Sequence, residues 1–104
     1  MKTKIVTLAY RGEWKNLLTL LRQQPELVNS TSEPKGYTPL HQAAWHGASL
    51  SVVGELLALG ANPSIRTKSK LQTAREIAAE KYESRSDLQF LLAENGRTPA
   101  LSLS

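Results

Sequence analysis

The amino-acid sequence has an internal period: Ala44 follows Ala9 by 35 residues, and Ala79 follows Ala44 by the same interval. Gly12, Gly47 and Tyr82 keep this spacing too. A fixed period between about 20 and 50 residues is typical of a solenoid, in which each repeat is one supersecondary unit that buries its apolar face against its neighbours. The sequence therefore predicts a stack of about three such units.

The middle unit contains the clearest pair of predicted helices. Thr38 and Pro39 mark the start of the first helix, because a threonine hydroxyl can accept from a free backbone N–H and proline needs no donor at the first helical position. Gly47 ends this helix and Gly60 ends the second. The second helix is indicated by apolar residues at helical spacing: Val52, Val53, Leu56 and Leu57. The polar stretch 62–72 is then a connector to the next unit.

This unit resembles an ankyrin repeat. The resemblance is carried by three groups of residues: Gly36-Tyr37-Thr38-Pro39-Leu40-His41-Gln42-Ala43-Ala44 with Gly47, then Val52-Val53 with Leu56-Leu57, then Gly60-Ala61-Asn62. Residues 8–29 resemble the N-terminal capping version of the same repeat, and residues 73–96 resemble a C-terminal version. The resemblance implies an all-α ankyrin-repeat solenoid of stacked helix-turn-helix units joined by projecting turns.

The resemblance also suggests boundaries. We expect a single ankyrin-repeat domain over residues 1–96, followed by a flexible C-terminal tail over residues 97–104. The expected repeat units are 4–35, 36–70 and 71–96. Thr73 marks the first helix of the last unit, and either Lys70 or Leu71 stands just before it where the family usually has a turn glycine.

The residues that could carry chemistry are better explained by structure. His41 and His46 are the only histidines, and a separation of five residues places them on different sides of a helix, so no metal site is predicted. The resemblance implies that His41 makes hydrogen bonds that hold neighbouring turns together. The last unit favours an exposed ion-pair face made by Glu76, Glu80 and Glu83 with Arg75, Lys81 and Arg85. Without a cysteine, a phosphate loop or a triad order, we interpret the chain as a non-enzyme that needs no cofactor.

The charge balance narrows the choice of partners. The 104 residues include 13 basic and 9 acidic side chains, a net charge of +4. Much of the excess lies in one predicted turn without acids, at Arg66, Lys68, Lys70 and Arg75. This turn is either a contact for an acidic protein partner or a solvated loop. Nucleic acid is ranked last, because the basic residues are not interleaved with aromatic ones. No signal peptide or apolar stretch of about 20 residues is present, so we expect a cytoplasmic protein without a membrane contact.

Partner contacts are expected where the repeat pattern leaves residues open. In an ankyrin stack the first helices line a concave face and the turns project from it. The candidate partner-binding residues are Tyr10, Arg11, Lys35, Tyr37, Trp45, His46, Lys68, Lys70 and Lys81. Trp45 falls in an open position, and large aromatic side chains often anchor protein interfaces. Trp14 begins a predicted second helix and is expected in the core instead.

These observations favour one function and leave others open. The leading hypothesis is a protein-binding module, acting as a stand-alone inhibitor of the immunity type or as an adaptor. The alternative is a structural or regulatory subunit of a larger assembly. We expect a monomer or a weak homo-oligomer, and the identity of the partner does not follow from these residues.

Overall fold

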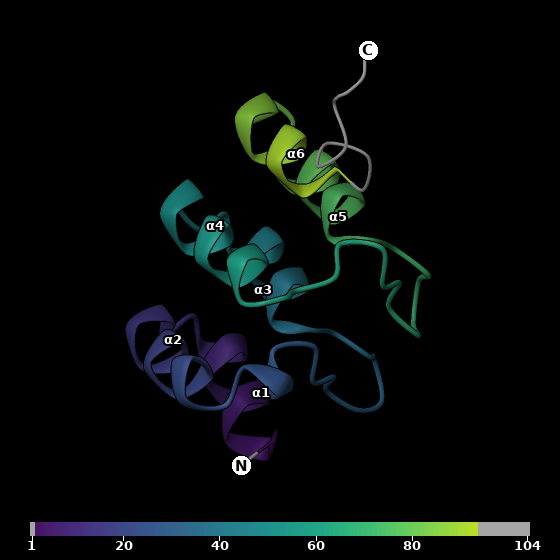
Figure 1. Cartoon of the computed structure of the whole chain (residues 1–104). Coiled ribbons are helices and arrows are strands. Elements are labelled where there is room, and N and C mark those ends of the chain that lie inside the picture. Colours follow the sequence, from purple (N-terminus) through teal and green to yellow (C-terminus); the bar gives the residue numbers. More distant parts are fainter. Residues whose placement is uncertain (1, 94–104) are drawn as a thin grey trace.

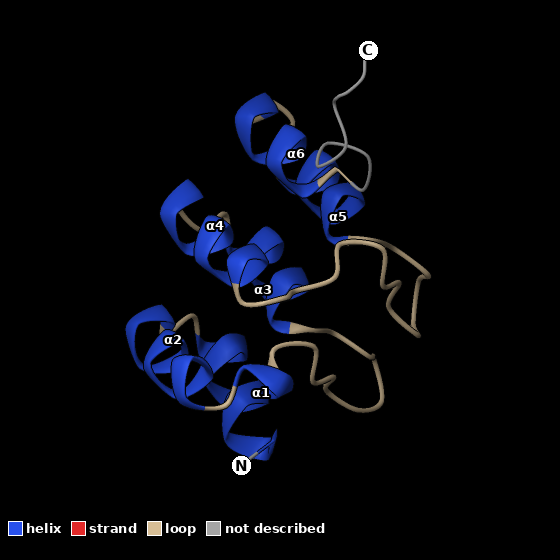
Figure 2. Ribbon diagram, viewed as in Figure 1, coloured by secondary structure: helices blue, strands red, loops and turns tan. Residues whose placement is uncertain are grey.

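The structure is a computed structural model that describes residues 2–93. The predicted tail over residues 97–104 and the end of the predicted last unit lie outside the described residues. All the regular structure of the described part is helical (Figure 2). The elements are α1 (Lys2–Arg11), α2 (Trp14–Gln23), the 3-10 helix η1 (Pro25–Leu27), α3 (Pro39–His46), α4 (Leu50–Ala58), α5 (Ala74–Lys81) and α6 (Ser86–Leu92).

The helices within residues 2–93 form three antiparallel pairs that stack in chain order (Figure 1). The inner helices α1, α3 and α5 contact each other in sequence, and the outer helices α2, α4 and α6 do the same. The inner helices end at Arg11, His46 and Lys81, which keep the 35-residue interval seen in the sequence. The predicted all-α solenoid of stacked helix-turn-helix units is confirmed.

Small residues set the spacing between the inner helices. Ala9, Ala44 and Ala78 are buried on these helices. Their side chains are small, so neighbouring backbones can approach closely. Larger apolar side chains fill the space between the inner and outer layers: Ile5, Leu17, Leu21, Leu40, Leu56, Ile77 and Leu88. The core is therefore continuous along the stack, as a repeat protein requires.

Two inner helices begin with the same capping arrangement. The Thr38 hydroxyl accepts from the His41 backbone N–H, and the His41 ring accepts from the Thr38 backbone N–H. In α5 the Thr73 hydroxyl accepts from the Glu76 backbone N–H, and the Glu76 carboxylate accepts from the Thr73 backbone N–H at 3.0 Å. Each pairing satisfies two backbone donors that a helix start leaves free.

The prediction that acidic and basic residues of the last unit pair with one another on an exposed face is wrong. Glu76 caps α5 and lies 3.2 Å from Arg66, which comes from the connector before the helix. Arg85 pairs with Asp87 at 3.2 Å, at the start of α6. Within residues 2–93 no salt bridge joins the glutamates and basic residues of that predicted face. Capping geometry decides these contacts, because a carboxylate at the third helical position reaches back to its own helix start.

Both long connectors project from the same side of the stack (Figure 1). We call residues 32–37 the first projecting turn and residues 67–72 the second. In each turn, the backbone N–H of the first residue donates to the backbone carbonyl of the last. Ser32 N donates to Tyr37 O at 2.9 Å, and Thr67 N donates to Gln72 O at 2.9 Å. The turns also touch, since Lys68 N donates to Lys35 O at 2.8 Å.

The structure shows that Leu71, and not Lys70, stands at the turn position where the family usually has glycine. Leu71 has φ +55° and follows Gly36, which has φ +72°, by one period of 35 residues. Leucine therefore occupies the left-handed backbone position for which the family usually has glycine.

Candidate functional site

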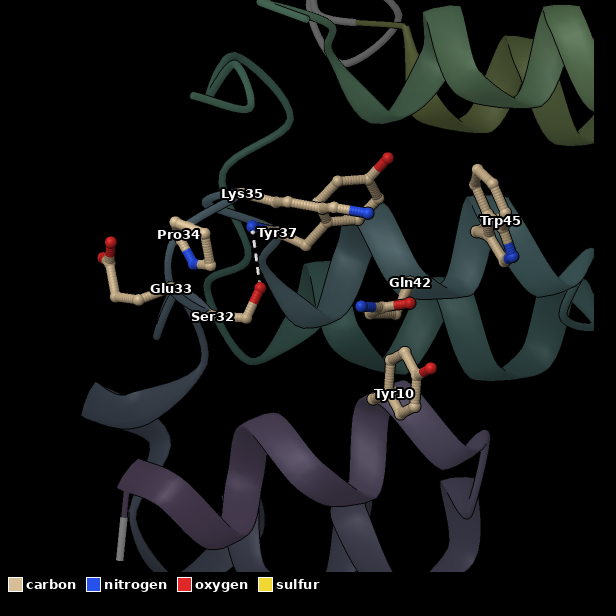
Figure 3. A pocket seen from close by; sticks show the side chains of 8 residues that line it. All are labelled: Tyr10, Ser32, Glu33, Pro34, Lys35, Tyr37, Gln42 and Trp45. Carbon is tan, nitrogen blue, oxygen red and sulfur yellow. Dashed lines mark hydrogen bonds between the residues drawn. The ribbon is translucent and has the colours of Figure 1, made fainter. Parts of the chain in front are cut away.

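A groove of about 390 Å³ lies where the first projecting turn meets α1 and α3 (Figure 3). We call it the aromatic groove, because three of its lining side chains are large aromatic rings. Its lining residues are Tyr10, Ser32, Glu33, Pro34, Lys35, Tyr37, Gln42 and Trp45. Four of the predicted partner-binding residues thus meet in one place, namely Tyr10, Lys35, Tyr37 and Trp45.

Two of the three aromatic side chains of the groove are open to solvent, whereas Tyr37 is half-buried against the core. Tyr10 is 70% exposed and Trp45 is 42% exposed. The rings of Tyr37 and Trp45 meet edge to face, with centroids 6.3 Å apart and an interplanar angle of 77°. Such a pair holds both rings in place while leaving part of their surface free.

Lys81 covers part of Trp45. Its Nζ lies 3.6 Å from the centroid of the indole ring, a close cation–π contact. The ammonium comes from the end of α5 and the indole from the end of α3, so this contact joins two repeats. Trp45 therefore presents an apolar edge beside a fixed positive charge.

The ends of the inner helices are tied together by an arrangement that recurs from one repeat to the next. His46 Nε2 donates to the Tyr10 carbonyl at 2.9 Å. One repeat later, the Tyr82 hydroxyl donates to the Trp45 carbonyl at 2.9 Å. The Tyr82 ring packs against Gly47, where a Cβ would lie 2.8 Å from Tyr82 Cζ, so glycine is needed there for packing as well as for ending α3. These bonds fix the backbone that carries both groove aromatics.

His46 is therefore occupied within the chain. Its ring lies near Gly12 and meets Trp14 edge to face at 5.8 Å. Trp14 is partly buried against the core, in the packing position expected for it.

The remaining predicted contact residues are basic, and several are paired internally. Lys68 Nζ lies 2.7 Å from a Glu33 carboxylate oxygen, and Arg11 lies 3.6 Å from Glu13. Arg66 donates to the Leu71 carbonyl as well as to its acidic partner in α5. Two of the four basic residues expected in this turn are thus paired with the protein's own carboxylates. Arg75 lies in α5 instead of the turn, and within residues 2–93 neither Lys70 nor Arg75 forms a salt bridge.

His41 lies under the projecting turns and takes no part in the open surface. Its Nδ1 accepts from the Thr38 backbone, so Nε2 carries the proton and donates to the carbonyls of Ile65 at 2.9 Å and Gln72 at 3.1 Å. Burial lowers the pKa of His41 below the ordinary value of 6.5, against a smaller raising effect of the two carbonyls. The ring is a neutral structural link between repeats, the role that the resemblance implied.

Sequence reasoning missed Gln42 as a lining residue. The repeat pattern alone accounts for Gln42 in the sequence, and its side chain is only 7% exposed. Its spacing of three residues from Trp45 places both on one face of α3, and this signal was available from the sequence. Ser32 and Glu33 were missed as well, because their place beside α1 depends on how the first projecting turn folds back.

Two other classes of site receive no support in the described residues. Across residues 2–93, no group of three or more His, Asp or Glu side chains is arranged to hold a metal ion. The described helices are all too short or too polar to cross a membrane.

Stacked helix pairs with projecting turns define a helical-repeat protein. The family model for the Ankyrin repeat matches residues 35–68, which span α3, α4, the end of the first projecting turn and the start of the second. Together with the stacked helix pairs, this match fits an ankyrin-repeat protein, and an ankyrin repeat supports a protein–protein interaction module. No curated protein and no solved structure gives a significant match to the chain.

Proposed function

We propose that this chain binds a protein partner through the aromatic groove. The observation that carries the proposal is the exposure of large aromatic rings around one concavity, Tyr10 at 70% and Trp45 at 42%. Exposed aromatic clusters are uncommon on surfaces without a binding role, and tryptophan and tyrosine often supply most of the energy of an interface.

The groove is also well prepared for binding. The carbonyls of Tyr10 and Trp45 accept bonds from the next repeat, and the Tyr37 and Trp45 rings support each other. A surface that is already ordered loses little conformational entropy when a partner arrives. This supports a rigid recognition surface over one that folds on binding.

The mode of action we favour is occlusion. A domain of this size, with a groove on one side, acts by covering a surface of its partner, as an inhibitor of the immunity type or as an adaptor does. We place its function in binding and not in catalysis, and we propose a protein partner instead of a nucleic acid.

The proposal is tested by photo-crosslinking. A benzoylphenylalanine residue replaces Tyr37 in the groove, and in a matched control it replaces Ser51, an exposed residue of α4 in the outer layer. We expect one protein of the native cell lysate to crosslink at position 37 and not at position 51. Excess wild-type chain should compete, whereas excess Trp45→Ala should not. Equal crosslinking at both positions contradicts the proposal.

Trp45→Ala gives the quantitative form of the same test. Once the partner is identified, the substitution is expected to weaken binding by about 2 kcal/mol, as loss of an interface anchor does. Phe90→Ala is the matched control, because Phe90 is 71% exposed on α6 and does not line the groove. Titration calorimetry measures the affinities, and thermal melting shows that both variants fold. A large drop in melting temperature with unchanged affinity would make Trp45 a structural residue.

A second candidate, a subunit of a larger assembly, is supported by Phe90 itself. An aromatic ring that is 71% exposed on the last described helix is suited to packing against a further protein surface. Molar mass measured by light scattering across a concentration series separates the two functions. A monomer supports the binding module, and a discrete oligomer that Phe90→Asp dissociates supports the subunit.

A further inference from the structure

We infer that the partner occupies the aromatic groove with an extended acidic segment that carries an aromatic side chain. This inference rests on the proposed function, and it adds the chemistry of the ligand. It follows from the charges around the groove and from the shape that the three rings give it.

The lining of the groove holds one positive and one negative side chain, and Lys68 beside it adds a second positive charge. Among its lining residues, Lys35 and Glu33 are the ionisable groups with opposite charges at neutral pH. Glu33 is already compensated, because Lys68 Nζ lies 3.0 and 2.7 Å from its two carboxylate oxygens. No salt bridge within residues 2–93 involves Lys35. Among the described residues, Lys35 is therefore a cation without a carboxylate partner at the turn side of the groove.

A second cation stands at the helix side. Lys81 Nζ rests 3.6 Å from the centre of the Trp45 ring. A lysine ammonium has three N–H donors, so it can donate to a carboxylate while its charge stays on the indole face. The nearest acidic neighbour in the chain, Glu80, accepts a bond from Gln72 at 3.3 Å. Trp45 and Lys81 thus form a composite surface that suits an apolar side chain next to a carboxylate.

The space between these cations is aromatic. Tyr10, Tyr37 and Trp45 face the groove from α1, the first projecting turn and α3 (Figure 3). An incoming ring can meet their edges and faces as Tyr37 and Trp45 already meet each other. Carboxylates on either side of that ring would then reach Lys35 and Lys81. A chain of opposite charge pattern would place its cations against both lysines and be repelled.

The experiment uses the full chain with Trp14→Phe, which leaves Trp45 as the single tryptophan. The Trp45 fluorescence is excited at the long-wavelength edge of the tryptophan absorption band, where tyrosine does not absorb. The probes are a random copolymer of glutamate and tyrosine, poly-glutamate, and a random copolymer of lysine and tyrosine. We expect a saturable fluorescence change with the first, at least about tenfold weaker binding of the second, and none with the third.

Two charge variants locate the effect. Lys35→Gln with Lys81→Gln should weaken binding of the glutamate–tyrosine copolymer at least about tenfold, and raised salt should weaken it further. Lys2→Gln with Lys15→Gln removes the same charge from exposed positions of α1 and α2 that do not line the groove, and should change binding less than about twofold. Thermal melting checks that both double variants fold.

Three results overturn the inference. Poly-glutamate that binds as tightly as the copolymer shows that charge alone acts, and equal losses in the two double variants show that the groove is not the site. Absence of any saturable change shows that the groove takes no acidic segment. These failures differ from failure of the proposed function. A partner that crosslinks at position 37 but lacks an acidic segment keeps the groove as a binding site and rejects only its chemistry.

Discussion

The two projecting turns have the same backbone bonds but different residues at the same point. Gly36 N donates to Ser32 O at 2.7 Å, and Leu71 N donates to Thr67 O at 3.0 Å. Both residues have positive φ, yet Gly36 is buried and Leu71 is 65% exposed. The difference arises from stacking, because the second turn lies over the first. Glycine is required by sterics only where the next turn covers it, and at Leu71 only the backbone preference remains.

Gly36→Ala is expected to have the largest effect. A Cβ at this position would lie 2.7 Å from Lys68 Cγ and 2.9 Å from the Lys68 backbone nitrogen, so the two turns must move apart. With the cost of positive φ added, we expect a loss of about 3 kcal/mol of unfolding free energy, measured by urea titration. Gly54→Ala is the matched control, because nothing lies within 4 Å of its Cβ position in α4, and it should gain about 0.5 kcal/mol. Equal effects of the two substitutions would mean that the turns do not support each other.

His41→Gln addresses the bond between α3 and the second turn. Glutamine can still accept from the Thr38 backbone, but it cannot also reach the Ile65 and Gln72 carbonyls. We expect a loss of about 2 kcal/mol at neutral pH, because two carbonyls lose their donor.

The same residue predicts a pH dependence. The folded protein holds the pKa of His41 below 6.5, so the unfolded chain binds a proton more readily. Stability is therefore fully present above pH 6.5 and falls as the pH drops below it towards the lower folded pKa. Urea titrations between about pH 7.5 and about pH 5.5 should show this slope in the wild type, and His41→Gln should flatten it. An unchanged slope in the variant would assign the titration to another group.

Leu71→Gly is expected to stabilise the protein. It removes the preference of a leucine against positive φ, partly offset by the greater freedom of glycine in the unfolded chain, for a gain of about 0.5 to 1 kcal/mol. Leu71→Ala separates backbone from side chain, because it shortens the side chain and keeps the backbone preference, and it should bring no gain. A loss on substitution by glycine would show that the exposed leucine makes a stabilising contact.

Lys68→Gln should have the smallest effect. The pair of Lys68 with Glu33 joins the two turns but is exposed on both sides, and such pairs contribute about 0.5 kcal/mol or less. A double-mutant cycle with Glu33→Gln at low and high salt measures the coupling. Coupling well above this range would mean that the ion pair, and not the backbone bond between Lys68 and Lys35, holds the turns together.

Most of the fold could be predicted because its signals are local. Thr38, Gly47 and Thr73 mark helix ends through bonds to residues three or four positions away, and the structure places them as caps. The same local reasoning failed for Glu76, whose carboxylate was assigned to an exposed face although its position three residues after Thr73 allowed a capping box.

The site was harder to predict, because it brings together residues from neighbouring repeats that are far apart in the sequence. Tyr10, Tyr37 and Trp45 could be proposed as open positions, but not that they surround one groove with Gln42. Nor could the sequence show that Lys81 would lie over Trp45. Long side chains choose among several rotamers, and the choice depends on the neighbouring repeat.

The sequence by itself determined the number and order of the stacked units. A period of 35 residues, helix caps and small residues at the inner faces leave one way to bury the apolar surface. Only the tertiary structure decided which cations are paired, since it pairs Lys68 with Glu33 and Arg66 with Glu76, whereas no salt bridge within residues 2–93 involves Lys35 in the lining of the aromatic groove. The reason is physical: capping and periodicity act within a few residues, whereas the charge and shape of a surface depend on how neighbouring repeats pack.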